Sequence, residues 1–311
     1  MKIFITGGAG FIGSHVTNKI LDAGHEVTVY DDLSKGYLEY VDKRARFVKA
    51  DLADFKTLMK AISGHDAVIH LAAESIIKAS IDNPKTHLEK NINNAINLLE
   101  AIRLNGVNKI VFSSSAAVYG ETGQKPVKED AKKSPLQPYG ASKYAIEVLL
   151  SAYHHSFGIS STSLRYFNVY GPRDDQLPVT RAVPNWFKAT LTSRPVVLNW
   201  AGKQLRDYIF VKDVASAHLL ALEKCGGLNN YNIGSGSGHT MIDILESVFK
   251  AAGKRVPVKD GGERSGDPSR LVADVRKIRK ELGWIPKYSL EQGMEETFIF
   301  YKTHPQSLKR I

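Results

Sequence analysis

The chain of 311 residues contains a single cysteine, Cys225, so it cannot form an internal disulfide or hold a metal on several cysteine sulfurs. We therefore predict no metal site. Long apolar runs are also missing: none approaches the roughly 20 residues that cross a bilayer. The first apolar residues meet Gly7, Gly8 and Gly10 too soon for a secretory signal. These absences predict a cytoplasmic protein that binds no membrane.

Acidic residues are outnumbered, since 42 Lys and Arg face 32 Asp and Glu and give a formal net charge of +10. A surplus of this sign is found in nucleic-acid-binding proteins. Here, however, the basic residues are mostly interleaved with acidic ones, as in segment 274–281, and no recognition motif accompanies them. We predict no nucleic-acid partner. The surplus indicates either an anionic small substrate, such as a nucleotide diphosphate, or simply a lysine-rich composition.

Short apolar runs alternate with helical patterns through the first half of the chain. Strands separated by helices of this length predict a parallel sheet with right-handed crossovers. Strands are predicted at Lys2–Thr6, Glu26–Tyr30, Arg46–Ala50, Ala67–His70, Lys109–Ser113 and Ser161–Arg165. Helices are predicted at 11–23, 54–63, 84–105 and 139–157.

After about residue 168 this rhythm breaks, and prolines punctuate a loop-rich region. The predicted fold class is therefore α/β, a Rossmann-type doubly wound parallel sheet with a smaller C-terminal α/β substrate-binding domain. Residues 1–168 plus about 211–238 would form the dinucleotide-binding domain. Residues of about 169–210 and 239–311 would form the substrate-binding domain.

A glycine-rich loop, Gly7-Gly8-Ala9-Gly10-Phe11-Ile12-Gly13, lies between the first predicted strand and the first predicted helix. Glycines let the backbone turn sharply and let a pyrophosphate approach the N–H groups at the helix N-terminus. A simple turn is the alternative interpretation, but the flanking strand and helix favour a dinucleotide site. A second glycine run, 234–238, lacks a matching acidic residue downstream, so we predict a structural role for it.

Acidic residues end the next two predicted strands. Asp31, with Asp32 beside it, ends the second strand, where a carboxylate accepts hydrogen bonds from ribose hydroxyls and repels a 2′-phosphate. The position favours NAD over NADP, although an acidic turn is the plain alternative. Asp51 ends the third strand and is predicted to contact adenine at the same edge.

A tyrosine–lysine pair, Tyr139 and Lys143, stands one helical turn apart, so both side chains can face the same way. An ammonium beside a phenol lowers the pKa of the phenol, which would make Tyr139 a usable acid or base. Tyr208 and Lys212 share the spacing, but segment 206–211 is predicted to be a strand, which would hold these two side chains apart. Only the first pair has the required geometry.

Three serines, Ser113, Ser114 and Ser115, end the fifth predicted strand. Ligands of open parallel sheets bind outside the carboxyl ends of the strands, so these hydroxyls face the expected site. Serine is equally suited to a strand-to-turn transition, and the sequence leaves both interpretations open.

Together these features resemble the extended short-chain dehydrogenase/reductase family, and within it the UDP-hexose 4-epimerases. The motifs that carry the resemblance occur in the family's order along nearly the whole chain. They are His70-Leu-Ala-Ala73, Phe112-Ser-Ser-Ser-Ala-Ala-Val-Tyr-Gly120, Tyr139-Gly-Ala-Ser-Lys143, Leu164-Arg-Tyr-Phe-Asn168, Arg206-Asp-Tyr208 and Arg264-Ser-Gly-Asp267.

The resemblance implies a mechanism and a catalytic group of Tyr139, Lys143 and Ser115. Tyr139 would take the proton of the sugar 4-hydroxyl while hydride passes to NAD⁺, and Lys143 would hold the nicotinamide ribose. Ser115 would bond the reacting oxygen. The 4-keto sugar would turn over, and hydride would return to its other face.

The resemblance also implies binding residues, a UDP-sugar substrate and a homodimer formed through helices 84–105 and 139–157. The residues implied to bind NAD are Gly7, Gly10, Phe11, Ile12, Gly13, Asp31, Asp32, Asp51, Leu52, Leu71, Ala72, Ala73, Asn91, Tyr139, Lys143 and Phe167. For the substrate they are Ser115, Tyr139, Asn168, Arg206, Arg264 and Asp267.

Related enzymes carry acidic residues directly after the serine or threonine at the strand end. In 4,6-dehydratases these residues serve to eliminate water, and nucleotide-sugar decarboxylases carry a glutamate there. Here Ala116 and Ala117 supply no proton, which argues against both reactions. Leu271 falls where the family has a side chain that lines the hexose pocket. Its intermediate size does not distinguish a bare hexose from an N-acetylated one. Arg181 lies where epimerases of this type often contact the substrate, so a charged sugar, and with it a UDP-glucuronate 4-epimerase, stays an alternative. A non-catalytic NAD(P)-binding sensor on the same fold is the other alternative.

Overall fold

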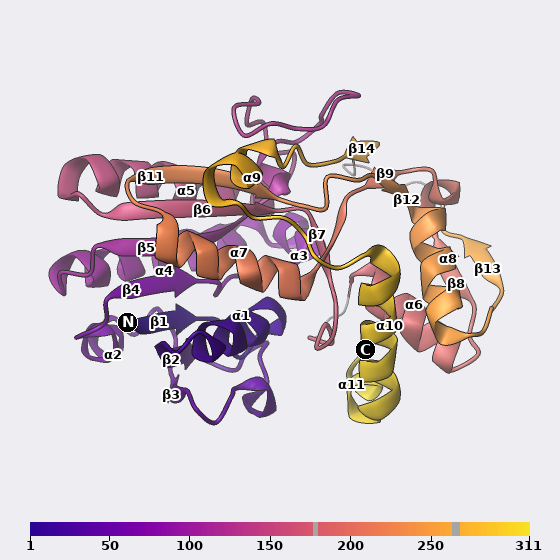
Figure 1. The fold of residues 1–311 in the computed structure, drawn as a ribbon, viewed down its shortest axis with the longest axis horizontal. Coiled ribbons are helices and arrows are strands. Elements are labelled where there is room, and N and C mark those ends of the chain that lie inside the picture. The colour runs from indigo at the N-terminus through magenta and orange to yellow at the C-terminus, as the bar shows by residue number, and fades with distance from the viewer. Residues whose placement is uncertain (177–179, 263–267) are drawn as a thin grey trace.

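The computed structural model describes residues 1–176, 180–262 and 268–311. Its main sheet consists of parallel strands in the order β11-β6-β5-β4-β1-β2-β3 (Figure 1). The strands are β1 (Lys2–Thr6), β2 (Glu26–Asp31), β3 (Arg46–Lys49), β4 (Ala67–His70), β5 (Lys109–Ser115), β6 (Ser160–Tyr166) and β11 (Leu228–Ile233). The order changes direction between β1 and β4, which is the switch point where doubly wound sheets bind ligands. The predicted fold class is confirmed.

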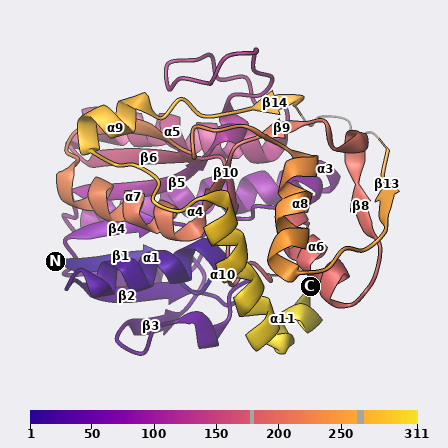
Figure 2. The same ribbon diagram turned by 45° about the vertical axis from the view of Figure 1, so that its right-hand side comes forward.

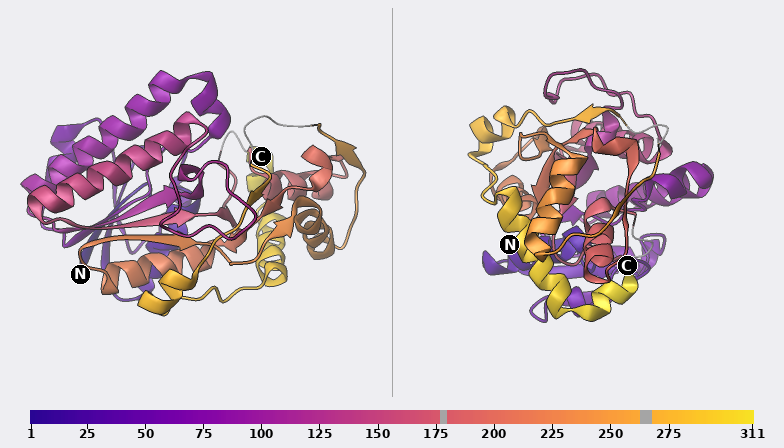
Figure 3. Two further views of the ribbon diagram at one scale, coloured as in Figure 1. Left: turned by 90° about the horizontal axis from the view of Figure 1, so that it is seen from above. Right: turned by 90° about the vertical axis from the view of Figure 1, so that its right-hand side faces the viewer.

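Helices cover both faces of this sheet because successive strand residues point to opposite sides. In β1, Ile3 and Ile5 pack toward one face and Phe4 toward the other. Figure 3 (left) shows the two helical layers with the sheet between them. One layer contains α1 (Phe11–Asp22), α7 (Val211–Lys224) and α9 (Arg276–Leu282). The other contains α2 (Phe55–Ile62), α3 (Ile77–Asp82), α4 (Pro84–Leu104) and α5 (Pro138–Phe157).

A second lobe packs beside the carboxyl ends of the main strands (Figures 1 and 2). Its core lies between helices and includes Phe187, Ile244 and Met294. The helices are α6 (Ala182–Leu191), α8 (Met241–Ala252), α10 (Leu290–Thr303) and α11 (Pro305–Arg310). The short strands are β7 (Asn168–Tyr170), β8 (Val196–Leu198), β9 (Leu205–Arg206), β10 (Tyr208–Phe210), β12 (His239–Thr240), β13 (Val258–Asp260) and β14 (Arg270–Leu271).

Two predicted boundaries differ where they affect the site. Strand β5 extends to Ser115, because Ser114 and Ser115 continue the ladder with Arg165 and Tyr166 of β6. The predicted strand over 206–211 is interrupted at Asp207, and α7 begins at Val211. No helix in the described ranges has the length and apolar content needed to cross a bilayer.

Candidate functional site

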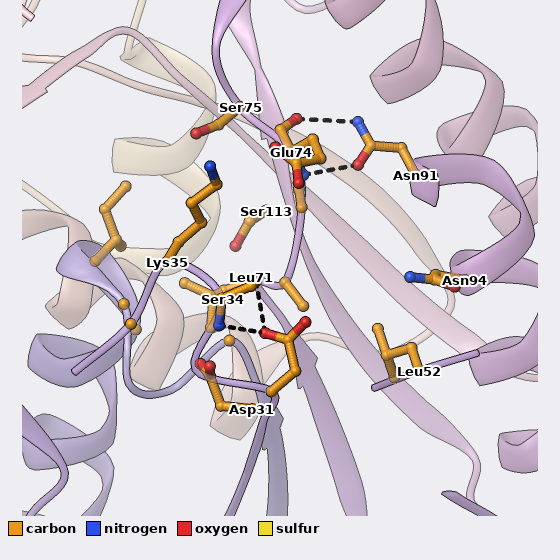
Figure 4. Close-up of a pocket in the computed structure, with 18 of the residues that line it drawn as sticks. Asp31, Ser34, Lys35, Leu52, Leu71, Glu74, Ser75, Asn91, Asn94 and Ser113 are labelled. Carbon is orange, nitrogen blue, oxygen red and sulfur yellow. Dashed lines mark hydrogen bonds between the residues drawn. The ribbon is translucent and has the colours of Figure 1, made fainter. Parts of the chain in front are cut away.

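A pocket opens at the carboxyl edge of the main sheet, around the switch point between β1 and β4 (Figure 4). It brings together most of the residues that the sequence predicted for a dinucleotide. These are Gly7, Gly10, Phe11, Ile12, Gly13, Asp31, Asp32, Asp51, Leu52, Leu71, Ala72, Ala73, Asn91, Tyr139 and Lys143.

The glycine loop forms the floor of this pocket. Gly7 has a φ of 74°, and a Cβ on it would lie 2.5 Å from the amide nitrogen of Ala72, so only glycine fits. A Cβ on Gly13 would lie 2.0 Å from the carbonyl oxygen of Gly7. Within the described chain, α1 has neither a capping side chain at Gly10 nor an acidic residue in its first turn. Its N-terminal N–H groups can therefore meet an anion.

Asp31 stands at the end of β2 and is 8% exposed. Its carboxylate accepts hydrogen bonds from the N–H groups of Ala9, at 3.0 Å, and Leu33, at 2.9 Å. Burial raises the pKa of Asp31, and these two hydrogen bonds oppose that rise. The carboxylate is thereby fixed beside the glycine loop, where ribose hydroxyls can reach it. Asp32 instead accepts hydrogen bonds from the N–H and hydroxyl of Ser34.

Asn91 on α4 fixes the wall of the pocket that contains Glu74. Its side-chain amide accepts a hydrogen bond from the Glu74 N–H at 2.9 Å and donates one to the Glu74 carbonyl at 3.0 Å, both visible in Figure 4. The same amide lies 3.1 Å from His87 and donates to Ser142 on α5. One buried side chain thus joins the loop after β4 to two helices.

Lys143 lies on the first turns of α5 and is 4% exposed. Its ammonium donates to the Ser113 carbonyl at 2.8 Å and lies 4.9 Å from the centroid of the Phe112 ring. Burial lowers the pKa of Lys143 to about 7, although the charge of Glu147 acts in the opposite direction. At neutral pH this amine is close to its midpoint, so its charge responds to neighbouring groups.

Tyr139, one turn earlier on α5, shares a side-chain hydrogen bond with Ser115. Burial raises the pKa of Tyr139, and the Ser115 hydrogen bond and the charge of Arg181 act against that rise. The prediction that Lys143 lowers this pKa is wrong for the described pocket: the net change is upward, and the opposing cation is Arg181. Desolvation of a phenolate outweighs the nearby positive charge.

Other predicted residues, including Ser115, lie outside the lining of this pocket. Phe167 is buried in a cluster with Ala116 and Tyr119. Asn168 begins β7 and donates its N–H to the Asp207 carbonyl at 2.9 Å, while Arg206 is buried on β9. Arg264 and Asp267 lie outside the described residues.

The two patterns set aside in the sequence have structural roles. Tyr208 belongs to β10, whereas Lys212 is on α7 and forms an ion pair with Glu296. Asp207 is fully buried and accepts hydrogen bonds from Ser235 and from the Gly236 N–H. The second glycine run therefore wraps around a buried carboxylate.

The sequence did not identify several lining residues. Gln176 comes from the second lobe, and no pattern in the first half of the chain indicates that it returns to the glycine loop. Arg181 comes from the same lobe and was named in the sequence only as a contact for a charged sugar. Asn94 lies one helical turn after both Asn91 and Lys90, so the helical period could have found these lining residues. The remaining unpredicted lining residues are Tyr30, Ser34, Lys35, Gly36, Ala50, Glu74, Ser75 and Tyr166, whereas Ser113 and Ser114 line the pocket at the strand end where they were expected.

Comparisons with known proteins agree with this geometry. The model of the NAD dependent epimerase/dehydratase family matches residues 3–234. A UDP-glucose 4-epimerase of Lacticaseibacillus casei is 37% identical over 325 aligned residues, covering 98% of both chains.

Solved structures are similar over the same length. The UDP-glucose 4-epimerase of Thermus thermophilus in complex with NAD is 39% identical with a TM-score of 0.92, covering 97% of this chain and 99% of that one. The UDP-N-acetylglucosamine 4-epimerase of Methanobrevibacter ruminantium, in complex with UDP-N-acetylmuramic acid, is 33% identical with a TM-score of 0.92, covering 97% and 98%. The chain belongs to the NAD dependent epimerase/dehydratase family.

Proposed function

We propose that this protein is an NAD-dependent isomerase that epimerises UDP-sugars at carbon 4, acting on UDP-glucose and UDP-galactose, on UDP-N-acetylglucosamine and UDP-N-acetylgalactosamine, or on both pairs. The observation that carries the proposal is that Tyr139, which shares a hydrogen bond with Ser115, lines the pocket with the glycine-loop floor together with Lys143. The names of full-length relatives support the same reaction.

The pocket fits NAD by its donor set and its shape. The uncapped N-terminus of α1 suits a diphosphate, and the Asp31 carboxylate suits the hydroxyls of an unphosphorylated ribose. Gly7 and Gly13 let the backbone of the loop pack closely against Ala72 and against itself, where any Cβ would clash. When bound, NAD⁺ supplies a reversible hydride acceptor for carbon 4 of the sugar.

Tyr139 would hold and return the proton of the sugar 4-hydroxyl, with Ser115 bonded to the same oxygen. A buried phenol gives up its proton only where positive charge or hydrogen bonds stabilise the phenolate. Ser115 and Arg181 act in that direction here. Lys143 would bind the nicotinamide ribose, with its amine held in place by the Ser113 carbonyl.

The UDP moiety would bind toward the second lobe. Arg206 suits a diphosphate because a guanidinium can bond phosphate oxygens bidentately, and Asn168 on β7 donates its N–H to the carbonyl of Asp207, the residue after Arg206. Arg264 and Asp267, which the family resemblance assigns to the same role, are outside the described residues.

Two side reactions of related enzymes are disfavoured by the residues after Ser115. Ala116 is 2% exposed and begins a short 3₁₀ turn that also contains Ala117. Neither side chain can donate a proton. The site can therefore oxidise and reduce carbon 4 without an acid at this position to eliminate water.

The UDP-glucuronate alternative rests on Arg181, which lines the pocket. Its guanidinium forms an ion pair with Asp174, which is 1% exposed. Because this partner already neutralises Arg181, the pocket favours a neutral sugar over a carboxylate. The sensor alternative leaves the Tyr139–Ser115 hydrogen bond beside Lys143 without a use.

The domain division stays a proposal: residues 1–168 and about 211–238 bind the dinucleotide, and about 169–210 and 239–311 bind the substrate. Helix α9 of the latter reaches back onto the main sheet, where Ile278 and Leu282 join its core. A homodimer through α4 and α5 is supported by exposed apolar side chains, Ile96 and Leu104 on α4 and Val148 and Phe157 on α5. A cytoplasmic location stays a prediction.

The test is to incubate the purified protein separately with UDP-glucose, UDP-N-acetylglucosamine and UDP-glucuronate, without added cofactor, and to follow the products by proton NMR. We expect the 4-epimer from one or both neutral sugars, which would also indicate that NAD co-purifies. Turnover only of UDP-glucuronate would select the alternative. If none of the three UDP-sugars is converted, even after NAD⁺ is added, the proposal is contradicted.

A further inference from the structure

The last helix, α11, packs against the segment that follows β2 at a separation of 267 residues. The hydroxyl of Ser307 lies 3.2 Å from that of Tyr40, and both side chains are buried. Figures 1 and 2 show α11 lying next to the β2–β3 side of the sheet, below α10. The second lobe therefore touches the dinucleotide side of the molecule at a place distant in sequence from both the glycine loop and Tyr139.

Arg310 makes the charged contacts of this junction. Its guanidinium lies over the Tyr37 ring, 3.8 Å from the centroid, and pairs with Glu39 at 2.8 Å. The same group is 3.4 Å from the carboxylate of Asp175. A planar cation can stack and form ion pairs at once, so Arg310 holds two separate segments together.

The first of these segments continues into the pocket wall. The Tyr37 N–H donates to the Ala9 carbonyl of the glycine loop at 3.1 Å. The residues just before it, Ser34, Lys35 and Gly36, line the pocket. Gly36 packs so closely that a Cβ on it would lie 2.8 Å from Ala9. A shift of Tyr37 would therefore move the wall that faces Asp31.

The second segment carries Gln176. Asp175 is fully buried and accepts a hydrogen bond from Tyr40 at 2.6 Å in addition to its contact with Arg310. The neighbouring Gln176 lines the pocket, and its amide nitrogen is 3.1 Å from where a Cβ on Gly10 would stand. That nitrogen is buried and has no hydrogen-bond partner among the described residues. A buried donor in this condition, above a helix N-terminus, suits a phosphate oxygen.

We propose that Arg310 is a positioning residue for the dinucleotide site, which holds the wall of residues 34–36 through Tyr37 and the amide of Gln176 through Asp175. The inference rests on the proposed function in one respect, that a dinucleotide binds in this pocket. Loss of Arg310 removes the ion-pair partner of the buried Asp175 carboxylate and leaves the charge of Arg173 as the cation that acts on it, and a buried charge that loses a partner is costly. The segment that carries Gln176 then moves toward water, away from the glycine loop.

The experiment uses the full chain, freed of co-purified cofactor, and titration calorimetry with NAD⁺ and, separately, with UDP. Arg310→Ala should raise the Kd for NAD⁺ on the order of tenfold and leave the Kd for UDP unchanged. Arg310→Lys should recover part of the loss, because it keeps the charge but not the stacked plane. Arg276→Ala is the matched control, since it removes an exposed arginine paired with Asp274 outside the pocket.

If Arg310→Ala does not fold, Tyr37→Leu removes the stacking surface together with the 3.5 Å hydrogen bond from the Tyr37 hydroxyl to the Asp175 carbonyl, and it should show the same selective loss of NAD⁺ binding. An unchanged Kd for NAD⁺ in a folded variant would overturn the inference, and so would an equal weakening of NAD⁺ and UDP, which indicates general loosening. A wild-type chain that binds no NAD⁺ would overturn the proposed function as well. The two failures are therefore distinguishable.

Discussion

Burial shifts the two ionisable groups of the proposed catalytic centre in opposite directions. It raises the pKa of Tyr139 and lowers that of Lys143 to about 7, because each charged form loses its hydration. In the pocket as described, the neutral phenol is therefore favoured at neutral pH, whereas the Lys143 amine is close to half protonated there and becomes mostly neutral above it. Positive charge brought by a bound ligand would shift Tyr139 toward the phenolate.

The first prediction concerns the hydroxyl of Tyr139. Tyr139→Phe removes the proposed acid and base while keeping the ring, so turnover of UDP-glucose should fall by about 10²–10⁴-fold. Binding of NAD⁺ and UDP should be unchanged in calorimetry. Tyr144→Phe, on the same helix and outside the pocket lining, is the control and should retain activity. Full activity of Tyr139→Phe would disprove the assignment.

A buried ion pair lies behind Lys143. Glu147, one turn further along α5, binds Arg165 of β6 at 2.7 Å and accepts a hydrogen bond from Ser114 at 2.6 Å. Its negative charge raises the pKa of Lys143 against the effect of burial. The other titratable groups around this lysine are Tyr139, His70 on β4 and His87 on α4, and burial lowers the pKa of both histidines. At neutral pH Glu147 is thus the charge that favours the ammonium.

The second prediction concerns pH. Glu147→Gln removes the negative charge, so the pKa of Lys143 should fall below about 7, by on the order of one unit. The loss of activity that follows lysine deprotonation should then begin at lower pH. A direct measurement is ¹³C NMR of labelled lysine Cε in the ligand-free protein, with Lys143→Arg to assign the signal.

Ser114→Ala is the control for this measurement, because it deletes a hydrogen bond to Glu147 and no charge. Its lysine titration should match the wild type. If Glu147→Gln is unstable because Arg165 is left unpaired, Glu147→Leu with Arg165→Leu removes both charges and should shift the titration in the same direction. A titration that stays in place would contradict the electrostatic role.

Among the elements, β5 places three serines in three different tasks. The Ser113 carbonyl accepts a hydrogen bond from the Lys143 ammonium, and the Ser114 hydroxyl donates one to Glu147. Ser115 shares a side-chain hydrogen bond with Tyr139. Successive side chains of a strand point to opposite faces, so the Ser114 hydroxyl meets Glu147 on α5 while the Ser113 hydroxyl meets Tyr166 and only the Ser113 backbone carbonyl meets α5. One strand end therefore contacts α5 at three successive points.

The third prediction concerns the junction of β1 and α1. Gly13→Ala would place a Cβ 2.0 Å from the Gly7 carbonyl, and backbone rather than a flexible side chain would have to move. We expect NAD⁺ affinity to fall at least tenfold, an effect of about 1.4 kcal/mol. Thermal unfolding should also occur at lower temperature. Gly123→Ala meets open space and should change neither quantity.

At the scale of the whole molecule, the second lobe completes a pocket whose floor and outer walls belong to the main sheet. Gln176 and Arg181 reach the glycine loop from beyond β7, and α11 contacts the segment that follows the pocket wall of residues 34–36. A ligand held by both lobes contacts residues far apart in the sequence. Binding of NAD⁺ should consequently stabilise the contact between the lobes as well as the sheet.

The fourth prediction concerns association. The exposed apolar residues of α4 and α5 are proposed to meet their copies in a homodimer. Ile96→Glu combined with Val148→Glu should convert a particle of twice 34.4 kDa into one of 34.4 kDa in light scattering after gel filtration. Ile242→Glu, an exposed apolar position on α8, should leave the mass unchanged. A wild-type monomer would refute the proposed dimer.

The sequence by itself determined the elements whose signals are local. Apolar strands, helical periods and the glycine loop placed β1, α1, β2 and the tyrosine–lysine helix within a few residues of their observed bounds. The parallel order followed because strands joined by helices have few ways to pack. The glycine loop and Asp31 could be assigned to one pocket for the same reason, since the carboxyl ends of neighbouring parallel strands share an edge.

Only the tertiary structure decided what depends on burial and on contacts distant in sequence. The direction in which the pKa of Tyr139 moves follows from desolvation by residues of several elements, which spacing on one helix does not reveal. The return of Gln176 and Arg181 to the glycine loop follows from packing of the second lobe. The same holds for Arg310, whose contacts with Tyr37 and Asp175 carry no local pattern, because the energy that forms them comes from surfaces that meet only in the folded chain.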